Sequence, residues 1–203
     1  MVKDFPLLLD RFQRYADALS QATDPPNFQR DELAREVVRR LEQLAFISSQ
    51  IATLSAEFGK KVIVEVENES GEKELYNAGF ERDRQCEFLM RMLAEAFYYF
   101  AFRIRRIVRG NEFPFPGFKS FESVGARDVR NHLIEHPEGG ASRVLNQTWS
   151  WTPDSGPALK TARHEWESSD FVDKGFAANS TEYCIAFGEC LDRGLAELNT
   201  TGA

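Results

Sequence analysis

Hydrophobic residues recur at steps of three and four over most of this chain, which is the spacing of helices with one buried face. Pro25-Pro26 and Gly110 interrupt the pattern, and each interruption predicts the end of a helix. A fourth helix is expected to start after Ser120 or Ser123 and to end before Pro137. The stretches expected to be helical are residues 4–22, 27–58, 80–109, about 120–136 and about 181–198.

Two segments between these helices carry strand and turn signals instead. Residues 61–67 are β-branched and then alternate in polarity, residues 68–71 have turn chemistry, and residues 73–76 allow a return strand. Residues 143–163 repeat this arrangement around a Pro-Asp-Ser-Gly turn. The sequence therefore predicts a mainly α protein, a helical bundle of about five helices, in a single domain over residues 1–203. Small β-hairpin insertions are expected near residues 60–77 and 142–164.

Aromatic rings are expected to fill the interior, because the chain contains 17 Phe, 5 Tyr and 3 Trp. The third helix has apolar residues on nearly all sides, which indicates a central position. Phe113-Pro-Phe-Pro-Gly-Phe118 cannot continue a helix, so we expect a connector whose rings attach it to the core. Trp149, Trp151 and Trp166 fit either a platform that stacks nucleic-acid bases or, as we expect, packing of the second hairpin against the core.

Charge is distributed unevenly along the chain. The whole sequence carries a formal net charge of −7, which argues against unspecific coating of nucleic acid. Residues 101–130 nevertheless hold seven basic and three acidic side chains, a local charge of +4. The arginines at the end of the third helix suit either phosphate contacts or the helix dipole. The basic side chains of this segment are Arg103, Arg105, Arg106, Arg109, Lys119, Arg127 and Arg130.

Composition also bears on compartment and cofactors. No run approaches the roughly 18 apolar residues of a membrane span, and the first residues do not resemble a signal peptide, so no membrane association is expected. The three cysteines, Cys86, Cys184 and Cys190, include no Cys-x-x-Cys pair, which favours a reducing cytoplasm. Cys184 and Cys190 are expected to be small buried hydrophobic residues. The chain contains no glycine-rich phosphate loop and no dinucleotide fingerprint, so no cofactor is predicted.

One segment concentrates residue types that carry chemistry, the run Ala126-Arg-Asp-Val-Arg-Asn-His-Leu-Ile-Glu-His-Pro137, which holds two of the three histidines. On the expected fourth helix, Asp128 lies one turn before His132, so its carboxylate is placed to select the tautomer of that imidazole. His136 precedes Pro137, which biases its backbone away from helical geometry.

The overlapping spacings Arg130-Asn131-x4-His136 and Arg127-Asp128-x3-His132 resemble the Arg-x4-6-His signature of the HEPN superfamily. In that signature a polar residue, often Asn, follows the Arg, and the motif lies late in a bundle of four or five helices. The resemblance extends over residues 1–57, 80–136 and the last helix. It implies metal-independent cleavage of RNA, as in toxin or defence endoribonucleases, or a non-catalytic RNA-binding role. It also implies an antitoxin or another protein as a partner.

The implied chemistry suits these side chains. A histidine with a pKa near neutrality can move the proton of a 2′-hydroxyl, and an arginine can stabilise the charge of the phosphorane. On an ideal helix, however, the Arg and His of either pair lie about 120° to 140° apart. One chain therefore does not bring them together, and the family pattern implies that two copies complete the site. We accordingly expect a homodimer.

Two alternatives remain at this point. His132-Leu-Ile-Glu135-His136 matches the His-x-x-Glu-His order of inverted zinc peptidases, which makes a zinc-dependent hydrolase a minor alternative. A third ligand is not evident, since the only other histidine is His164, so no metal is predicted. The stronger alternative is a helical interaction or RNA-binding module that keeps the helical frame without catalysis.

Overall fold

The computed structural model describes residues 4–22, 27–58, 61–67, 71, 73–80, 84–110, 112–122, 125–130, 146–152, 154–162 and 169–201. Within these residues the chain is mainly helical with small antiparallel sheets, so the predicted fold class is confirmed. The helices are α1 (Asp4–Gln21), α2 (Phe28–Phe58), α3 (Arg84–Val108), α4 (Ala126–Arg130) and α5 (Phe176–Thr201). The strands are β1 (Lys61–Glu67), β2 (Lys73–Phe80), β3 (Asn146–Thr152), β4 (Gly156–Ala162) and β5 (Ser169–Val172).

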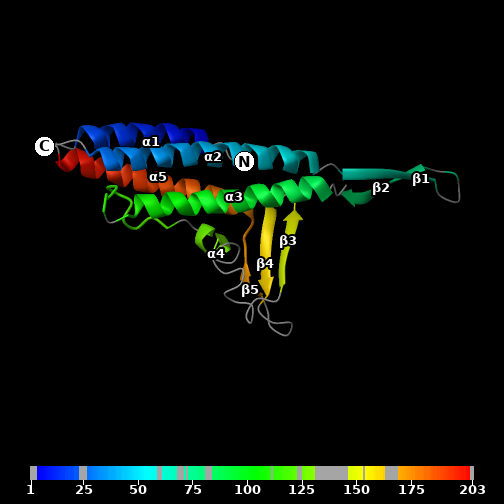
Figure 1. Ribbon diagram of the computed structural model, residues 1–203. Helices are drawn as coiled ribbons and strands as arrows, with labels where there is room; N and C mark the ends of the chain where they lie inside the picture. Colours follow the sequence, from blue (N-terminus) through cyan, green and yellow to red (C-terminus); the bar gives the residue numbers. More distant parts are fainter. Residues whose placement is uncertain are drawn as a thin grey trace.

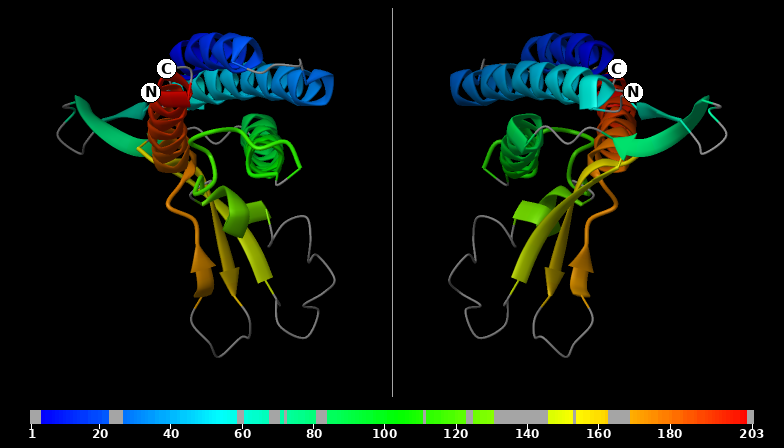
Figure 2. Two further views of the ribbon diagram at one scale, coloured as in Figure 1. Left: turned by 90° about the vertical axis from the view of Figure 1, so that its left-hand side faces the viewer. Right: turned by 90° about the vertical axis from the view of Figure 1, so that its right-hand side faces the viewer.

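The four long helices form the body of the molecule. Helices α1 and α2 make one layer, and α3 and α5 lie beneath them (Figures 1 and 2). The β1–β2 hairpin extends from one end of this body, and the sheet with strand order β3-β4-β5 projects away from the helices. Among the described residues, no helix is both long and apolar enough to cross a membrane.

Local sequence explains where the helices begin. Asn27 caps α2, because its side-chain Oδ1 accepts a hydrogen bond from the backbone N–H of Arg30 at 3.0 Å. Helix α3 begins at Arg84 rather than at Phe80, because β2 continues to Phe80 and pairs there with Lys61. Helix α5 begins at Phe176, before the expected start at residue 181, since its first turns contain buried polar side chains that the hydrophobic pattern does not register.

The second expected hairpin is present, and it has a third strand. Strands β3 and β4 pair antiparallel, as predicted, with Trp149 opposite the fully buried Leu159. The four-residue strand β5 was not predicted, because a segment so short shows no periodicity. Trp149 packs against the main core and Trp151 packs beside Met90, which confirms the packing role over a base-stacking platform. Trp166 lies outside the described residues.

The core consists largely of rings, as the composition predicted. Phe118 and Phe187 meet at a centroid distance of 4.9 Å with their planes 62° apart, and Phe97 meets Phe176 at 4.9 Å in an edge contact. The fully buried rings are Phe5, Phe12, Tyr15, Phe97, Tyr98, Phe118, Phe121, Tyr183 and Phe187. The cysteines Cys86, Cys184 and Cys190 are buried, as predicted for Cys184 and Cys190.

The aromatic connector between α3 and α4 is fixed to the core by its rings. Phe115 and Phe118 are buried, and two turns link them through the hydrogen bonds of Phe118 N–H to the Phe115 carbonyl and of Phe121 N–H to the Phe118 carbonyl. The hydroxyl of Tyr15 on α1 donates to the carbonyl of Pro116 at 2.9 Å. The connector is therefore an ordered part of the core, and it sets where α4 begins.

One expectation about α3 was wrong in part. Its inner face is buried from Met90 to Val108, but Phe88, Leu89, Met92 and Tyr99 are exposed. Helix α3 is thus not enclosed on all sides within one chain, because only one of its apolar faces finds a partner in α2, α4 and the second sheet.

Candidate functional site

Helix α4 carries the described part of the candidate motif. It begins after Gly125, the last residue of the connector, whose φ of +71° is a value that glycine adopts readily. Val129 is fully buried, and its N–H donates to the Gly125 carbonyl at 3.0 Å. The helix starts later than Ser120 or Ser123 because the connector must keep Phe118 and Phe121 in the core. The expected end at Pro137 lies outside the described residues.

Arg130, the first residue of the Arg-Asn-x4-His spacing, is held against α3. Its guanidinium carbon lies 3.9 Å from the ring centroid of Phe102, and the residue is only 8% exposed. The guanidinium of Arg105 lies 5.8 Å from the same ring. Such a stack uses the flat face of a guanidinium, while its N–H donors lie in the plane and point elsewhere. Arg130 therefore anchors α4 against α3.

Glu122 balances the arginines that lie next to this stack. Arg105 Nε and Nη2 each approach its carboxylate at 3.1 Å, and Arg109 pairs with the same carboxylate. Burial by itself raises the pKa of Glu122, but the hydrogen bonds and charges of Arg105 and Arg109 outweigh it and lower that pKa. Of the basic side chains near the end of α3, these two share one carboxylate, which offsets one of their two positive charges.

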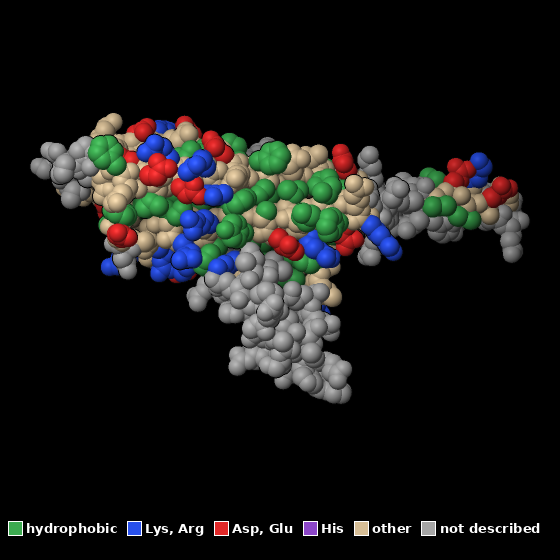
Figure 3. Space-filling view, in the orientation of Figure 1, with side chains coloured by type: hydrophobic (Ala, Val, Ile, Leu, Met, Phe, Trp, Pro, Cys, Tyr) green, Lys and Arg blue, Asp and Glu red, His purple; other side chains and the backbone are tan. Residues whose placement is uncertain are grey.

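Other basic side chains of the same segment remain on the surface. Arg103, Arg106 and Lys119 are exposed, and none of them has an ion pair with a described residue. In Figure 3, basic side chains gather over this end of the bundle. The positive charge predicted for residues 101–130 is therefore concentrated on fewer side chains than the sequence count indicated.

The predicted site residues are described only in part. Arg130 is buried in the stack, and Asp128 is exposed on α4. The backbone of Arg127 belongs to α4, but its side chain is outside the described set. Asn131, His132 and His136 lie entirely outside the described residues. The His132 and His136 pair of the zinc alternative is included in that gap, and no metal-ligating group of three or more side chains occurs in the described part.

A buried polar cluster of Tyr98, Asp173 and Asn179 lies behind α4 and was not found from the sequence. The Tyr98 hydroxyl donates to Asp173 Oδ2 at 3.1 Å, and Asn179 Nδ2 donates to the Tyr98 oxygen at 2.8 Å and also to Asp173. Burial raises the pKa of Asp173, and the hydrogen bonds that it accepts lower it in part. Burial also raises the pKa of Tyr98 well above its ordinary range.

This buried cluster also fixes the start of α4. A Cβ atom at Gly125 would lie 2.7 Å from the Oδ1 atom of Asn179, so the backbone at Gly125 is in close contact with that side chain. The three polar residues come from α3, from the segment after β5 and from α5. Their spacing in the sequence carries no signal, because only the fold brings them together.

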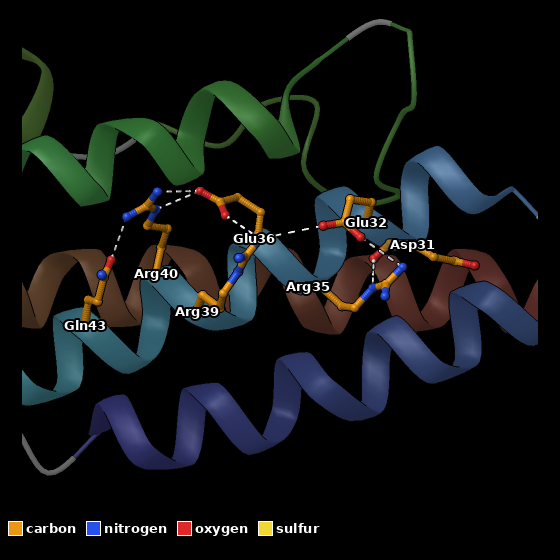
Figure 4. A network of polar contacts seen from close by, with 7 residues as sticks. All are labelled: Asp31, Glu32, Arg35, Glu36, Arg39, Arg40 and Gln43. Atoms are coloured by element: carbon orange, nitrogen blue, oxygen red, sulfur yellow. Dashed lines mark hydrogen bonds and ion pairs between the residues drawn. The ribbon is translucent and has the colours of Figure 1, made fainter.

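A separate network of charged side chains lies along α2 (Figure 4). Glu36 pairs with Arg39 at 2.9 Å and with Arg40 at 2.6 Å, and Glu32 pairs with Arg35 at 3.0 Å. Exposed pairs of this kind contribute little stability, about 0 to 1 kcal/mol each. Their main consequence is electrostatic, because the paired charges of α2 add little net charge beside the basic end of α3.

Comparison of the chain with protein-family models, with curated proteins and with solved structures gives no match in any of the three.

Proposed function

We propose that this chain is an HEPN-like, RNA-directed protein and that the segment starting at Arg130 cleaves RNA without a metal ion. The observation that carries the proposal is the stack of Arg130 on Phe102, with Val129 buried beside it. Together they hold the first residue of the Arg130-Asn131-x4-His136 spacing at a defined place on α3. A motif that served only as a polar surface would not require its arginine to be buried on an aromatic ring.

The proposed chemistry assigns one task to each side chain. His136 takes the proton of a 2′-hydroxyl, and the 2′-oxygen attacks the adjacent phosphorus. The bond from phosphorus to the 5′-oxygen of the next nucleotide breaks, that oxygen takes a proton from water and leaves as a 5′-hydroxyl, and a 2′,3′-cyclic phosphate remains. Arg130 donates in-plane N–H groups to the phosphorane oxygens, where a fixed cation in a low-dielectric site is most effective. Asn131 orients the phosphate by hydrogen bonding. The overlapping set Arg127, Asp128 and His132 is the alternative constellation for the same reaction.

The surroundings of α4 favour an anionic substrate. Arg103 and Arg106 are exposed on α3, one and four residues after Phe102, and they have no ion pair with a described residue. Arginine contacts to phosphates supply sequence-independent affinity that falls with salt. The formal charge of −7 over the whole chain keeps that affinity local, so we propose a narrow RNA substrate or an accessory protein, such as an antitoxin.

We further propose that the protein works as a homodimer in the cytoplasm. The thiols of Cys86, Cys184 and Cys190 are buried in the interior, which suits a reducing compartment. Two copies of the chain would also supply the Arg and His groups that a single α4 segment does not direct to one point.

The non-catalytic alternative has an observation in its favour as well. Arg130 is 8% exposed, so much of its guanidinium is engaged inside the protein. In that case the stack is purely structural, and the chain binds RNA or a protein through the surface arginines. The two functions differ in whether RNA is cut.

The deciding experiment is RNA cleavage by the purified wild-type chain in the presence of EDTA. We expect products with 2′,3′-cyclic phosphate ends. We expect His136→Ala to lower the cleavage rate at least about 100-fold, the usual contribution of a general acid or base. His164→Ala is the matched control, because His164 is the remaining histidine of the chain and lies outside the motif.

Arg130 needs a variant that separates folding from chemistry. Arg130→Lys keeps the charge and loses the planar stack, so we expect a folded protein by circular dichroism with strongly reduced cleavage. Binding of RNA by the wild-type chain without cleavage would favour the non-catalytic alternative. Cleavage that survives in His136→Ala and disappears in His132→Ala would move the site to the overlapping pair.

A further inference from the structure

A stripe of exposed hydrophobic side chains runs along the face that α2 and α3 share. The α2–α3 stripe consists of Phe46 on α2 and of Phe88, Leu89, Met92 and Tyr99 on α3. Figure 3 shows hydrophobic side chains in a continuous band over the middle of these two helices. Phe88, Met92 and Tyr99 share one side of α3 because they are separated by about one or two helical turns. The stripe thus has the spacing of a surface that packs against another helix.

An open groove lies beside the exposed hydrophobic side chains of the two helices. It lies between α2 and α3 and has a volume of about 580 Å³. Its lining residues are Arg39, Glu42, Gln43, Phe46, Ile47 and Phe100. The guanidinium of Arg40 covers Phe100 from one side at 5.0 Å from the ring centroid. The groove therefore provides a recess with an aromatic floor beside the projecting side chains of α3.

The exposed area of the stripe can be compared with what a stable interface needs. Phe46, Phe88 and Met92 are 62%, 57% and 51% exposed, and Tyr99 and Leu89 are 46% and 41% exposed. Because an aromatic side chain presents about 150–250 Å², the stripe offers roughly 500 Å² of apolar surface. A standard interface buries about 800 Å² on each partner, of which about 60% is apolar. The stripe therefore matches the apolar core of one standard interface, and it is at the upper limit for patches left exposed on a monomer.

We infer that this stripe is the contact between two copies of this chain, related by a two-fold axis with their α3 helices antiparallel. A two-fold axis sets the same patch against itself, so one long, regularly spaced stripe is complementary to its own copy. This contact is offered as that of the homodimer proposed above; it uses none of the residues from Arg127 to His136, so substitutions in the stripe test the dimer separately from the cleavage chemistry.

Charge selects the antiparallel orientation. Arg103 and Arg106 continue the exposed side of α3 beyond Tyr99, whereas Glu87 lies at the opposite end of the helix. Parallel pairing would place the arginines of both copies against each other, whereas antiparallel pairing separates them and sets them beside the half of α3 in which Arg84 and Arg91 are balanced by Glu87 and Glu95. Glu95 lies within the stripe, where burial raises its pKa and the charge of Arg91 lowers it.

The test is the oligomeric state of the full chain by sedimentation from about 1 to 100 μM, a range that covers weak and moderate dimers. The wild-type chain, of 23.2 kDa, is expected to sediment as a dimer. The double substitution Met92→Lys and Tyr99→Lys is expected to weaken dimerisation at least about 30-fold, as for loss of interface anchor residues. Both side chains are exposed in the monomer, so these lysines do not enter the core, and circular dichroism verifies the fold.

Ile185→Lys provides the matched control. Ile185 is 57% exposed on α5, away from the stripe, and its replacement should leave the dimer intact. A cysteine at position 92 should form an intersubunit disulfide under mild oxidation, while one at position 185 should not. A wild-type monomer at 100 μM would overturn the proposal. So would a dimer that resists the double substitution, or one that Ile185→Lys disrupts equally.

Discussion

Alanine substitutions at two glycines of α5 are expected to change the free energy of unfolding in opposite directions. Gly194 faces the connector, where an added Cβ would lie 2.7 Å from Cε2 of Tyr15 and still closer to the backbone carbonyl oxygen of Pro116. Gly188 faces α1, where an added Cβ would lie 3.1 Å from Nη1 of Arg11, the end of a flexible side chain. Alanine at either position should gain about 1 kcal/mol from helix propensity alone. The difference between the two variants therefore measures how rigidly the connector is held.

For Gly194→Ala, overpacking against backbone and a buried ring should cost about 3 kcal/mol, the upper part of the usual range. After the gain in helix propensity, we expect a net loss of about 2 kcal/mol in the free energy of unfolding. For a chain of this size that loss lowers Tm by about 4–8 °C. Gly188→Ala requires only a shift of the Arg11 side chain, so we expect a net gain of about 0.5 kcal/mol and a slightly higher Tm.

The assay is urea unfolding of both variants and the wild-type chain, monitored by far-UV circular dichroism and repeated as a thermal scan. Equal m-values would show that the variants differ in stability and not in the extent of unfolding. If Gly194→Ala were as stable as Gly188→Ala, the close approach of α5 to Pro116 would be incorrect. The account of how the connector positions α4 would then fail with it.

Two further predictions concern polar groups in and beside the candidate site. Tyr98→Phe removes the hydroxyl that links Asp173 and Asn179 and should lower the free energy of unfolding by about 1–3 kcal/mol in urea titrations. Tyr183→Phe should be neutral or stabilising, because the buried Tyr183 hydroxyl has no hydrogen-bond partner among the described residues; equal losses in both variants would contradict this. Glu122→Gln should destabilise by less than about 1 kcal/mol at pH 7, since that carboxylate is 54% exposed. The pKa of Glu122 is lowered in the folded state from an ordinary value of 4.5, so its contribution is full above that value and is lost as the pH falls through the folded pKa. Unfolding titrations at pH 7 and pH 3, with the exposed Glu112→Gln as control, should show a difference that is smaller at the lower pH.

The stack on Phe102 also explains how the described residues of α4 are held in helical form. A five-residue helix has little stability of its own in water, because the cost of nucleating it exceeds the gain from its few hydrogen bonds. Val129 and Arg130 add tertiary contacts with α3, and the Asn179 side chain meets the backbone at Gly125. The stability of α4 therefore derives from its neighbours, and substitutions at Phe102 are expected to act through α4.

The long helices could be predicted because their signal is local and repeated. Each buries one residue in every three or four, so many positions along α1, α2 and α5 report the same geometry. The hairpins were also predictable in outline, since β-branched alternation and turn residues are adjacent in the chain. Boundaries were less accurate, as at the start of α5, where Asn179 and Ser180 are buried by tertiary contacts that no hydrophobic pattern registers.

The candidate site depended much more on the tertiary structure. The sequence by itself identified the Arg130-Asn131-x4-His136 spacing and the excess of basic residues before it. It did not indicate that Arg130 would be buried on Phe102, although on a helix Arg130 lies one turn after Ala126 and close to the apolar face. Whether such an arginine faces water or packs on a ring depends on which side chain the neighbouring helix presents, and that is a property of the packed pair.

The same distinction applies to α3 and to the buried polar cluster. The sequence determined that α3 has apolar side chains on more than one face, because that follows from composition and spacing within a single helix. Only the tertiary structure decided that one face is covered while Met92 and Tyr99 remain exposed, since the coverage depends on where α2 and the second sheet lie. Tyr98, Asp173 and Asn179 are brought together in the same way. Local periodicity is set by the chain itself, whereas contacts between distant segments exist only after the fold has closed the intervening loops.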